Sequence, residues 1–438
     1  MGQLALYNGT ILTMDPPGTV IDNGLVWVED ARITYCGPAD APEAPQGPAA
    51  RRLDAAGGLI LPGLINCHTH ASMTLLRGLA DDLPLDIWLT QHIFPVESRL
   101  TAEAVYWGAL LAAVEMIRSG CTSFCDMYLF ASQVARAADE AGLRAVVGEV
   151  IYDFPSPSYG ELPNGYRITE ELLAAWQDHP RVRAAVMPHA LYTCSQPLME
   201  RAGQIAAEHA ADLNIHLAEG PGETAQVLAK WGRRPLAVLQ DLDLVNRRLW
   251  VDHAIDLDQA EIATLAAAGV RVAHCPESNM KLASGVMPLT AMWDAGVKVG
   301  LGTDGCASNN NLDLLGEMDT AAKLAKAAGL DPTAAPAERV LALATSEAGR
   351  VFGREGELGL LRPGALADLI VVDTNQPHLT PLYHPAGQLV YAADGSDVLH
   401  TVCHGQVLMA DRRLELLDEA RILARAREAA GQLTGRDL

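Results

Sequence analysis

The chain has 438 residues, of which 49% are hydrophobic and 20% are charged, and it includes 38 glycines and 25 prolines. This composition excludes a disordered or fibrous protein and leaves enough residues for a large buried core. The 54 acidic and 32 basic side chains give a net charge of −22, and no run of Lys or Arg exceeds a pair, so we expect no nucleic-acid partner.

The first residues lack the cationic and apolar regions of a signal peptide, and no segment approaches the length of a membrane span. The eight cysteines are scattered through the chain without a CxxC pair. We therefore expect a cytoplasmic protein with reduced thiols and no membrane partner.

The predicted elements begin with short strands of alternating polar and apolar residues at 4–13, 24–29 and 32–35, separated by turn residues such as Asn8-Gly9. Similar strands return late in the chain, at 368–372, 389–391, 398–403 and 406–409. We predict that the two ends, residues 1–58 and 356–438, form one small β-sandwich domain followed by a terminal helix.

Between these ends, apolar runs rich in Val, Ile and Leu alternate with amphipathic stretches. Eight strands are predicted, at 60–67, 122–127, 144–151, 182–189, 212–217, 249–253, 270–275 and 297–303. Helices are predicted at 101–118, 131–141, 170–176, 196–209, 258–268 and 290–295, and several end at glycine. Eight strand and helix units predict an α/β fold with a closed (β/α)8 TIM-like barrel over 59–355.

An open doubly wound sheet is the alternative fold, but it requires a GxGxxG loop after the first strand, where this sequence has Asn-Cys-His-Thr-His at 66–70. Segment 153–165, with three prolines, is predicted to be a long loop and a candidate lid.

The first barrel strand ends in His68-Thr69-His70, and alternate residues of a strand point the same way. Two imidazoles at this spacing form one edge of a metal site, although a coincidental surface pair is the alternative. His216 at the end of the fifth strand and Asp304 at the end of the eighth complete a set of three imidazoles and one carboxylate. We predict that these four residues bind one divalent ion with an attached water.

These segments resemble the amidohydrolase superfamily, through Pro62-Gly63-Leu64-Ile65-Asn66-Cys67-His68-Thr69-His70, His216-Leu217-Ala218-Glu219, Val251-Asp252-His253-Ala254 and Gly302-Thr303-Asp304. Binuclear members carry a carboxylated lysine on the fourth strand, and residues 182–189 contain none. The resemblance therefore implies a mononuclear metal site and a hydrolytic deaminase of a cyclic amidine.

The resemblance also implies the catalytic roles. Glu219 protonates the ring nitrogen, His253 contacts the attacking hydroxide, and Asp304 relays the water proton to the leaving amine. A rim carboxylate and a packing imidazole are the alternatives for Glu219 and His253. His274 has either a supporting role near the metal or a purely structural one. Zinc is the first candidate for the ion, with iron and manganese as alternatives.

Segments 75–89, 188–195 and 278–285 are similar to the 5′-methylthioadenosine/S-adenosylhomocysteine deaminases. This implies that Glu97 and His189 hold the nucleoside, with Glu97 accepting ribose hydroxyls, and that Trp88 offers a flat apolar face. Alternatively, Trp88 is a core residue and Glu97 an acidic residue at a helix start. Members of this family can carry arginines that bind the carboxylate of S-adenosylhomocysteine. We match neither Arg144 nor Arg167 to these arginines.

The predicted substrates are 5′-methylthioadenosine, S-adenosylhomocysteine or both, converted to inosine analogues with release of ammonia. The alternatives are adenosine, guanine, 8-oxoguanine or triazine aminohydrolases with the same metal site, an amide or cyclic-imide hydrolase, and a catalytically inactive scaffold. By resemblance, a homodimer or higher homo-oligomer is expected.

Overall fold

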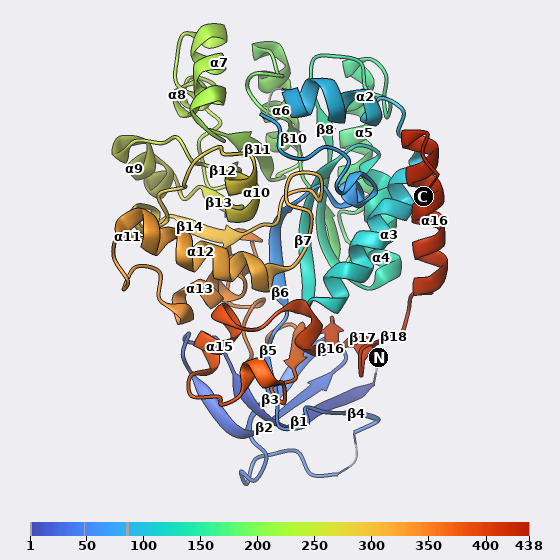
Figure 1. Ribbon diagram of the computed structural model, residues 1–438, viewed down its shortest axis with the longest axis vertical. Coiled ribbons are helices and arrows are strands. Elements are labelled where there is room, and N and C mark those ends of the chain that lie inside the picture. The colour runs from blue at the N-terminus through green and yellow to red at the C-terminus, as the bar shows by residue number, and fades with distance from the viewer. Residues whose placement is uncertain (1, 48, 85–86, 438) are drawn as a thin grey trace.

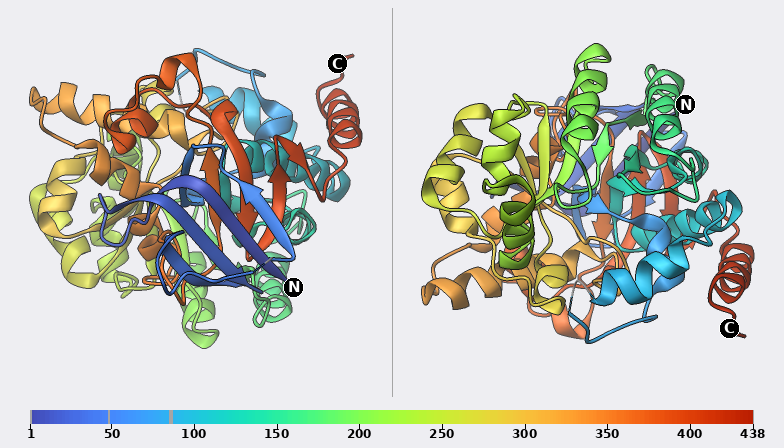
Figure 2. Two further views of the ribbon diagram at one scale, coloured as in Figure 1. Left: turned by 90° about the horizontal axis from the view of Figure 1, so that it is seen from below. Right: turned by 90° about the horizontal axis from the view of Figure 1, so that it is seen from above.

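A computed structural model of the chain describes residues 2–47, 49–84 and 87–437. Figure 1 shows a barrel surrounded by helices, with the strands from the two ends of the chain gathered below it. The views in Figure 2 show the helices arranged around the barrel and the sheet of the chain ends lying across its lower opening. The predicted α/β fold is therefore confirmed.

Eight parallel strand positions form the barrel wall, and the fourth position consists of two short pieces, β9 and β10. Backbone hydrogen bonds join its two sheets: the His216 N–H donates to the His189 carbonyl at 3.1 Å, and the Asp304 N–H donates to the His68 carbonyl at 3.0 Å. The strands are β6 Leu64–Thr69, β7 Cys121–Tyr128, β8 Arg144–Ile151, β9 Val182–Ala184, β10 Met187–Pro188, β11 Leu213–Leu217, β12 Leu249–His253, β13 Arg271–His274 and β14 Lys298–Leu301.

The outer helices begin and end at sequence signals for capping. Thr101 accepts a hydrogen bond from the first turn of α3, Asp258 and Glu261 form a capping box on α9, and Gly142 ends α4 in the left-handed conformation. These helices are α3 Ala102–Arg118, α4 Ala131–Ala141, α5 Leu162–Ala175, α6 Gln196–Glu208, α7 Pro221–Trp231, α8 Pro235–Asp241, α9 Gln259–Ala268, α10 Pro276–Lys281, α11 Leu289–Ala295, α12 Leu314–Gly329, α13 Ala337–Leu343 and α14 Ser346–Val351.

The strands of the chain ends form one continuous nine-stranded sheet. Residues from both of its halves, including Leu6, Val26, Val371 and Val402, pack into a single hydrophobic core, so the sheet is folded over on itself. Its strands are β1 Gln3–Leu12, β2 Val20–Glu29, β3 Arg32–Pro38, β4 Arg51–Asp54, β5 Leu59–Pro62, β15 Leu369–Val372, β16 Val398–Cys403, β17 Gln406–Ala410 and β18 Arg413–Leu414. The division at 1–58, 59–355 and 356–438 stays a prediction.

Three local predictions are wrong. Residues 389–391, predicted as a strand, end the helix α15 Pro385–Tyr391, because Pro385 suits a first helical turn and the imidazole of His384 accepts the N–H of Gly387. The helix predicted at 170–176 begins at Leu162, so the last part of the predicted loop 153–165 is helical, with Pro163 in the first turn. The strand predicted over 182–189 is interrupted between β9 and β10.

A helical segment after β6 crosses the upper end of the barrel. It comprises η1 Ala71–Leu76, the π-helix η2 Trp88–Ile93 and the short helix α2 Phe94–Glu97. Among the described residues, no single helix is long and apolar enough to span a membrane; only the pair 88–97 and 102–118, bent by 114°, passes that test when the two are taken together.

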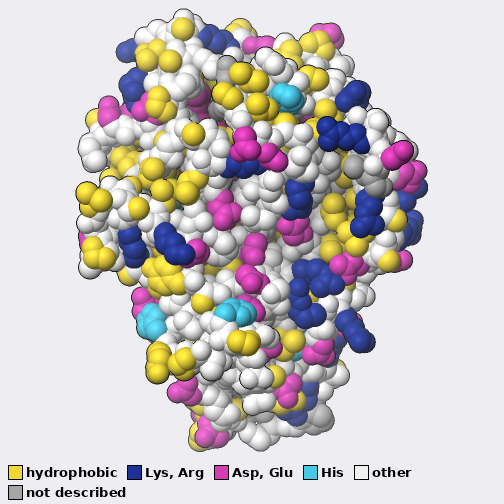
Figure 3. All heavy atoms as spheres, viewed as in Figure 1, with side chains coloured by type: hydrophobic (Ala, Val, Ile, Leu, Met, Phe, Trp, Pro, Cys, Tyr) yellow, Lys and Arg dark blue, Asp and Glu magenta, His cyan; other side chains and the backbone are white. Residues whose placement is uncertain are grey.

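The predicted terminal helix is α16 Glu419–Thr434, which packs beside α3 and forms an Arg118–Glu419 ion pair. On the face shown in Figure 3, Lys and Arg side chains are interspersed with Asp and Glu.

Candidate active site

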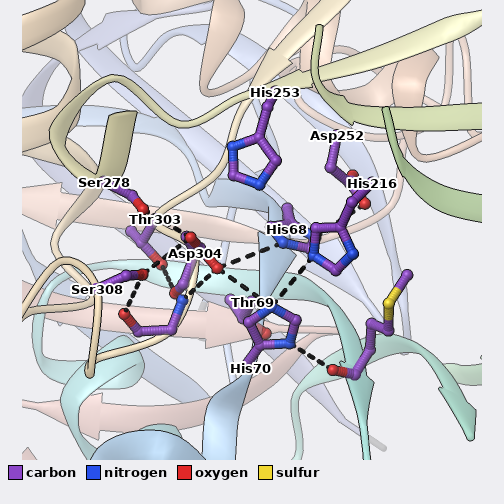
Figure 4. Close-up of polar contacts among 12 residues, drawn as sticks. His68, Thr69, His70, His216, Asp252, His253, Ser278, Thr303, Asp304 and Ser308 are labelled. Atoms are coloured by element: carbon purple, nitrogen blue, oxygen red, sulfur yellow. Dashed lines mark hydrogen bonds and ion pairs between the residues drawn. The ribbon is translucent and has the colours of Figure 1, made fainter. Parts of the chain in front are cut away.

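Five predicted side chains lie together at the carboxyl ends of the barrel strands (Figure 4). His68 lies in β6 and His70 directly follows it, His216 lies near the end of β11, His253 ends β12, and Asp304 follows β14. This is the end of the barrel at which TIM-like enzymes carry their catalytic groups.

Hydrogen bonds to the backbone determine which ring nitrogen carries the proton in His70 and in His216. Nδ1 of His70 lies 2.5 Å from the carbonyl of Met127, and Nδ1 of His216 lies 2.9 Å from the carbonyl of His189. Because a carbonyl only accepts, both Nδ1 atoms carry the proton and both Nε2 atoms present a lone pair. These Nε2 atoms face each other at 3.3 Å. Two lone pairs so close repel each other unless a cation lies between them.

The other ligand distances fit the same ion. Oδ1 of Asp304 lies 3.2 Å from Nε2 of His70 and 3.4 Å from Nε2 of His68. Two atoms bound about 2.0–2.1 Å from one tetrahedral zinc ion stand about 3.3–3.4 Å apart. The three printed distances and the grouping of His68 with His70 and His216 are therefore compatible with one zinc-like ion, and the donor types suit it.

The electrostatics of this cluster also favour a cation. Burial acts to lower the pKa of His68, but the carboxylates of Asp252 and Asp304 outweigh it and raise this pKa to about 10. Burial acts to raise the pKa of Asp304, but His68 and His70 outweigh it and hold this pKa well below its usual range. The carboxylates of Asp252 and Asp304 thus favour a positive charge beside His68, which a divalent ion would supply.

Asp304 is held by its own set of donors. Its Oδ2 accepts hydrogen bonds from the hydroxyls of Ser278 at 2.6 Å and Ser308 at 2.9 Å, and its Oδ1 accepts the N–H of Gly305 at 2.7 Å. These contacts orient the carboxylate toward the histidines.

Asp252 is a site residue to which the sequence analysis gave no role. Its Oδ2 lies 3.2 Å from Nδ1 of His68, and both of its oxygens accept from the amide of Asn214, at 2.9 and 3.0 Å. A metal-bound histidine commonly donates its other N–H to a carboxylate, which orients the ring. The sequence signal for Asp252 is its position next to His253, within the motif Val251-Asp252-His253-Ala254.

Left-handed backbone conformations direct several side chains into the site. The φ angles are +70° at His253, +59° at Asp304 and +51° at Ala218, just before Glu219. Non-glycine residues seldom adopt these angles, and they concentrate at functional sites. The turn at His253 allows the adjacent residues Asp252 and His253 both to face the barrel interior.

Glu219 and His253 border a pocket that the predicted metal ligands His70, His216 and Asp304 also line. Burial raises the pKa of Glu219, which suits a carboxyl that donates a proton. Nδ1 of His253 lies 2.9 Å from Oδ1 of Asn279. Because an amide oxygen only accepts, Nδ1 carries the proton and Nε2 is free to face the pocket.

The predicted nucleoside-binding residues line the same pocket: Trp88, Glu97 and His189. Burial raises the pKa of Glu97 and lowers that of His189 to about 3, so His189 is neutral. The hydroxyl of Thr193 donates to the carbonyl of Ala190 at 3.0 Å, so its oxygen accepts from Nδ1 of His189 at 2.8 Å. Nε2 of His189 remains as an acceptor.

The sequence left the roles of His274, Arg144 and Arg167 undecided, and none of the three lines the pocket. His274 is buried, and burial, with a smaller effect of His253, lowers its pKa to about 3. Arg144 forms a buried ion pair with Asp368 at 2.9 Å, which links the barrel to the sheet of the chain ends, and Arg167 pairs with Glu171 on the surface. Neither arginine lines the pocket.

Comparison with known proteins identifies the family. Residues 59–408 match the model of the amidohydrolase family. The chain is 55% identical over 427 residues to a 5-methylthioadenosine/S-adenosylhomocysteine deaminase of Syntrophobacter fumaroxidans, which covers 98% of this chain and 97% of the relative. The chain belongs to the amidohydrolase family.

Two further relatives agree with this assignment. The amidohydrolase described here is 42% identical to a 5'-deoxyadenosine deaminase of Methanosarcina mazei, over 100% of this chain and 99% of the other. A crystal structure of an adenosine deaminase from Xanthomonas campestris with bound zinc has a TM-score of 0.96 and 39% identity, and the match covers 99% of each chain. The predicted family and the predicted hydrolytic deaminase activity are confirmed. The family is metal-dependent, as the predicted cofactor requires.

Proposed function

We propose that this chain is a zinc-dependent deaminase that converts 5′-methylthioadenosine and related adenine nucleosides to the inosine analogues and ammonia. The observation that carries the proposal is that His68, His70 and His216 form one group of possible ligands, with Oδ1 of Asp304 within 3.4 Å of both His68 and His70. This group adjoins a pocket that also holds two buried carboxyl groups, Glu97 and Glu219. The deaminases of adenine nucleosides among the relatives support the substrate class.

The proposed ligands are His68, His70, His216 and Asp304. A zinc ion held there would lower the pKa of a bound water to about 7 and so would supply hydroxide at neutral pH. Iron and manganese accept the same donors, so the metal content of the purified protein decides among the three.

The protein residues supply the proton transfers. The reaction replaces the exocyclic amine at C6 of adenine by oxygen, which requires a proton on N1 of the ring and another on the departing amine. Glu219, with its raised pKa, protonates N1 and later takes a proton from the oxygen at C6, so that it is protonated again when the carbonyl has formed. Nε2 of His253 contacts the attacking oxygen, and the carboxylate of Asp304 accepts the proton of the water and passes it to the amine.

The remaining residues hold the nucleoside. The carboxylate of Glu97 accepts hydrogen bonds from the vicinal ribose hydroxyls, and such charge-assisted bonds are about twice as strong as neutral ones. His189 contributes its Nε2 acceptor, and Trp88 covers an apolar face of the ligand.

The test is a substrate panel, in which ammonia release and the ultraviolet change from adenine to hypoxanthine are followed with the zinc-loaded protein. We expect turnover of 5′-methylthioadenosine, 5′-deoxyadenosine and adenosine. Activity confined to guanine, 8-oxoguanine or triazines would show that the nucleoside assignment is wrong while leaving the metal site intact.

A further inference from the structure

The pocket is chemically divided between its floor and its walls. Its imidazole and carboxyl groups belong to His70, His189, His216, His253, Glu97, Glu219 and Asp304. Its apolar surface comes from residues that include Trp88, Leu89, Phe94, Leu129, Tyr152 and Leu282. Among the described lining residues there is no Lys or Arg. The residues outside the described ranges are Met, Pro, Leu, Asp and Leu, so every Lys and Arg of the chain has a described position.

Two aromatic residues of the pocket lining, Phe94 and Tyr152, contact the more exposed Phe154. The ring of Phe154 stacks on Tyr152 with 3.9 Å between centroids, and its centroid lies 5.7 Å from that of Phe94. Exposure rises outward through this group, from 7% at Tyr152 to 38% at Phe154. We refer to Phe94, Tyr152 and Phe154 as the aromatic collar. Phe154 belongs to the loop that was predicted as a candidate lid.

The proposed reaction fixes which part of a substrate reaches the collar. The reacting carbon of adenine must lie at the floor, beside His70 and Asp304. The ribose then lies farther out, and its 5′ substituent is the part directed toward the mouth.

Lys230, which contacts the lining residue Tyr192, and Lys281, which precedes the lining residue Leu282, already have partners. Nζ of Lys230 donates to the carbonyls of Leu191, Tyr192 and Cys194 at 2.7–3.2 Å, which uses all three of its protons. Nζ of Lys281 forms an ion pair with Asp81 at 2.6 Å and donates to the carbonyl of Ala307 at 3.3 Å.

The homocysteine end of S-adenosylhomocysteine carries a carboxylate and an ammonium group. In the collar its carboxylate meets aromatic surface in a protein of net charge −22, with no free cation on the described pocket wall. Removing a charged group from water without a partner is unfavourable, whereas a thioether or methyl group gains from contact with aromatic rings.

On the basis of the proposed function, we propose that the aromatic collar selects adenine nucleosides with an uncharged 5′ substituent. 5′-Methylthioadenosine and 5′-deoxyadenosine are then the preferred substrates, and S-adenosylhomocysteine is a poor one.

The experiment compares kcat/KM for 5′-methylthioadenosine, 5′-butylthioadenosine and S-adenosylhomocysteine. The butylthio compound has a tail of the same length as homocysteine but no charge, so it separates charge from size. We expect it to match 5′-methylthioadenosine within about threefold and to exceed S-adenosylhomocysteine by about tenfold or more, chiefly through KM. Equal or better turnover of S-adenosylhomocysteine than of the butylthio compound overturns the proposal. If none of the three is deaminated, the proposed function itself fails.

A variant tests the location. Phe154→Arg places a cation at the collar and is expected to raise the ratio of S-adenosylhomocysteine to butylthioadenosine turnover by about tenfold, because it supplies the missing partner of the carboxylate. Phe154→Leu controls for loss of the ring, and Tyr383→Arg, at a residue 89% exposed in the C-terminal part of the chain, controls for added charge. An unchanged ratio in Phe154→Arg, or an equal rise in Tyr383→Arg, contradicts the assignment to the collar.

Discussion

The backbone N–H of Glu219 donates a hydrogen bond to Oε2 of Glu223, with 2.6 Å between the two atoms. Glu223 lies in the first turn of α7 and is 4% exposed, and its Oε1 has no hydrogen-bond partner among the described residues. Burial is the main cause that raises the pKa of Glu223 to about 8, and the nearby carboxyl groups of Glu219 and Asp256 add to it. At neutral pH a protonated Glu223 therefore fixes the turn that carries Glu219 without repelling its carboxylate.

Replacing Glu223 is expected to affect turnover through the position of Glu219. Glu223→Gln keeps an oxygen that accepts the N–H of Glu219, so kcat stays within about threefold of the wild type. Glu223→Leu removes that acceptor and is expected to lower kcat by about 10- to 100-fold at nearly constant KM, because a general acid acts only when it is oriented. Steady-state kinetics on zinc-loaded protein measures both. If the two variants behave alike, Glu223 does not position Glu219.

The same carboxyl group predicts a dependence of stability on pH. In the unfolded chain Glu223 titrates near its ordinary value of 4.5, and in the folded protein near 8. Between these values the folded state binds more protons, so the contribution of Glu223 to stability falls as the pH rises and is fully lost above about 8. Glu223→Gln removes this term. We expect its thermal midpoint to rise relative to the wild type between pH 6 and pH 9. A constant difference over this range would contradict the raised pKa.

Strand-end positions explain why the sequence could place the four proposed metal ligands at one end of the barrel. The apolar runs that became β6, β11 and β14 placed His68, His216 and Asp304 at one end of a closed barrel, and strand alternation paired His68 with His70. The bounds of β8 and β12 agree with the sequence pattern for the same reason, since buried parallel strands are continuous apolar runs.

The residues that support these ligands were less predictable. The orientation of Asp252 depends on the left-handed turn at His253, which no periodicity reveals. The contact between Glu223 and Glu219 depends on where α7 begins, after Gly220. The three-residue segment 389–391 was too short to distinguish a strand from the end of α15.

Asp252 is expected to strengthen metal binding through His68. Asp252→Ala removes the carboxylate 3.2 Å from Nδ1 of His68 and should weaken zinc affinity by about 10- to 100-fold, as loss of such outer partners does. Competition with a chelator measures the affinity, and excess zinc should restore part of the activity. Asp294→Asn, at an exposed position in α11, is the control. Unchanged zinc affinity in Asp252→Ala would show that the contact does not support the ligand.

Glu97 is expected to recognise the ribose hydroxyls. For Glu97→Gln we predict a loss of about tenfold or more in kcat/KM with adenosine, since hydrogen bonds to a charged group contribute about 1.5–3 kcal/mol. With 2′,3′-dideoxyadenosine, which lacks both hydroxyls, the variant and the wild type should differ little. The four rate constants form a cycle that isolates the interaction. Equal losses with the two substrates would assign Glu97 a structural role at the start of the following helix.

Glu219 and His216 lie in the same short segment but are expected to fail in different ways. Glu219→Gln preserves the shape of the side chain and removes its titratable proton, so the variant should retain zinc and lose about 100- to 10,000-fold in kcat. His216→Ala removes a proposed ligand and should lose both zinc and activity. Metal content measured by elemental analysis, alongside single-turnover rates, separates the two cases. If Glu219→Gln also came out without zinc, Glu219 would be a ligand rather than the proton donor, and the acid that protonates the adenine ring would have to be sought elsewhere in the pocket.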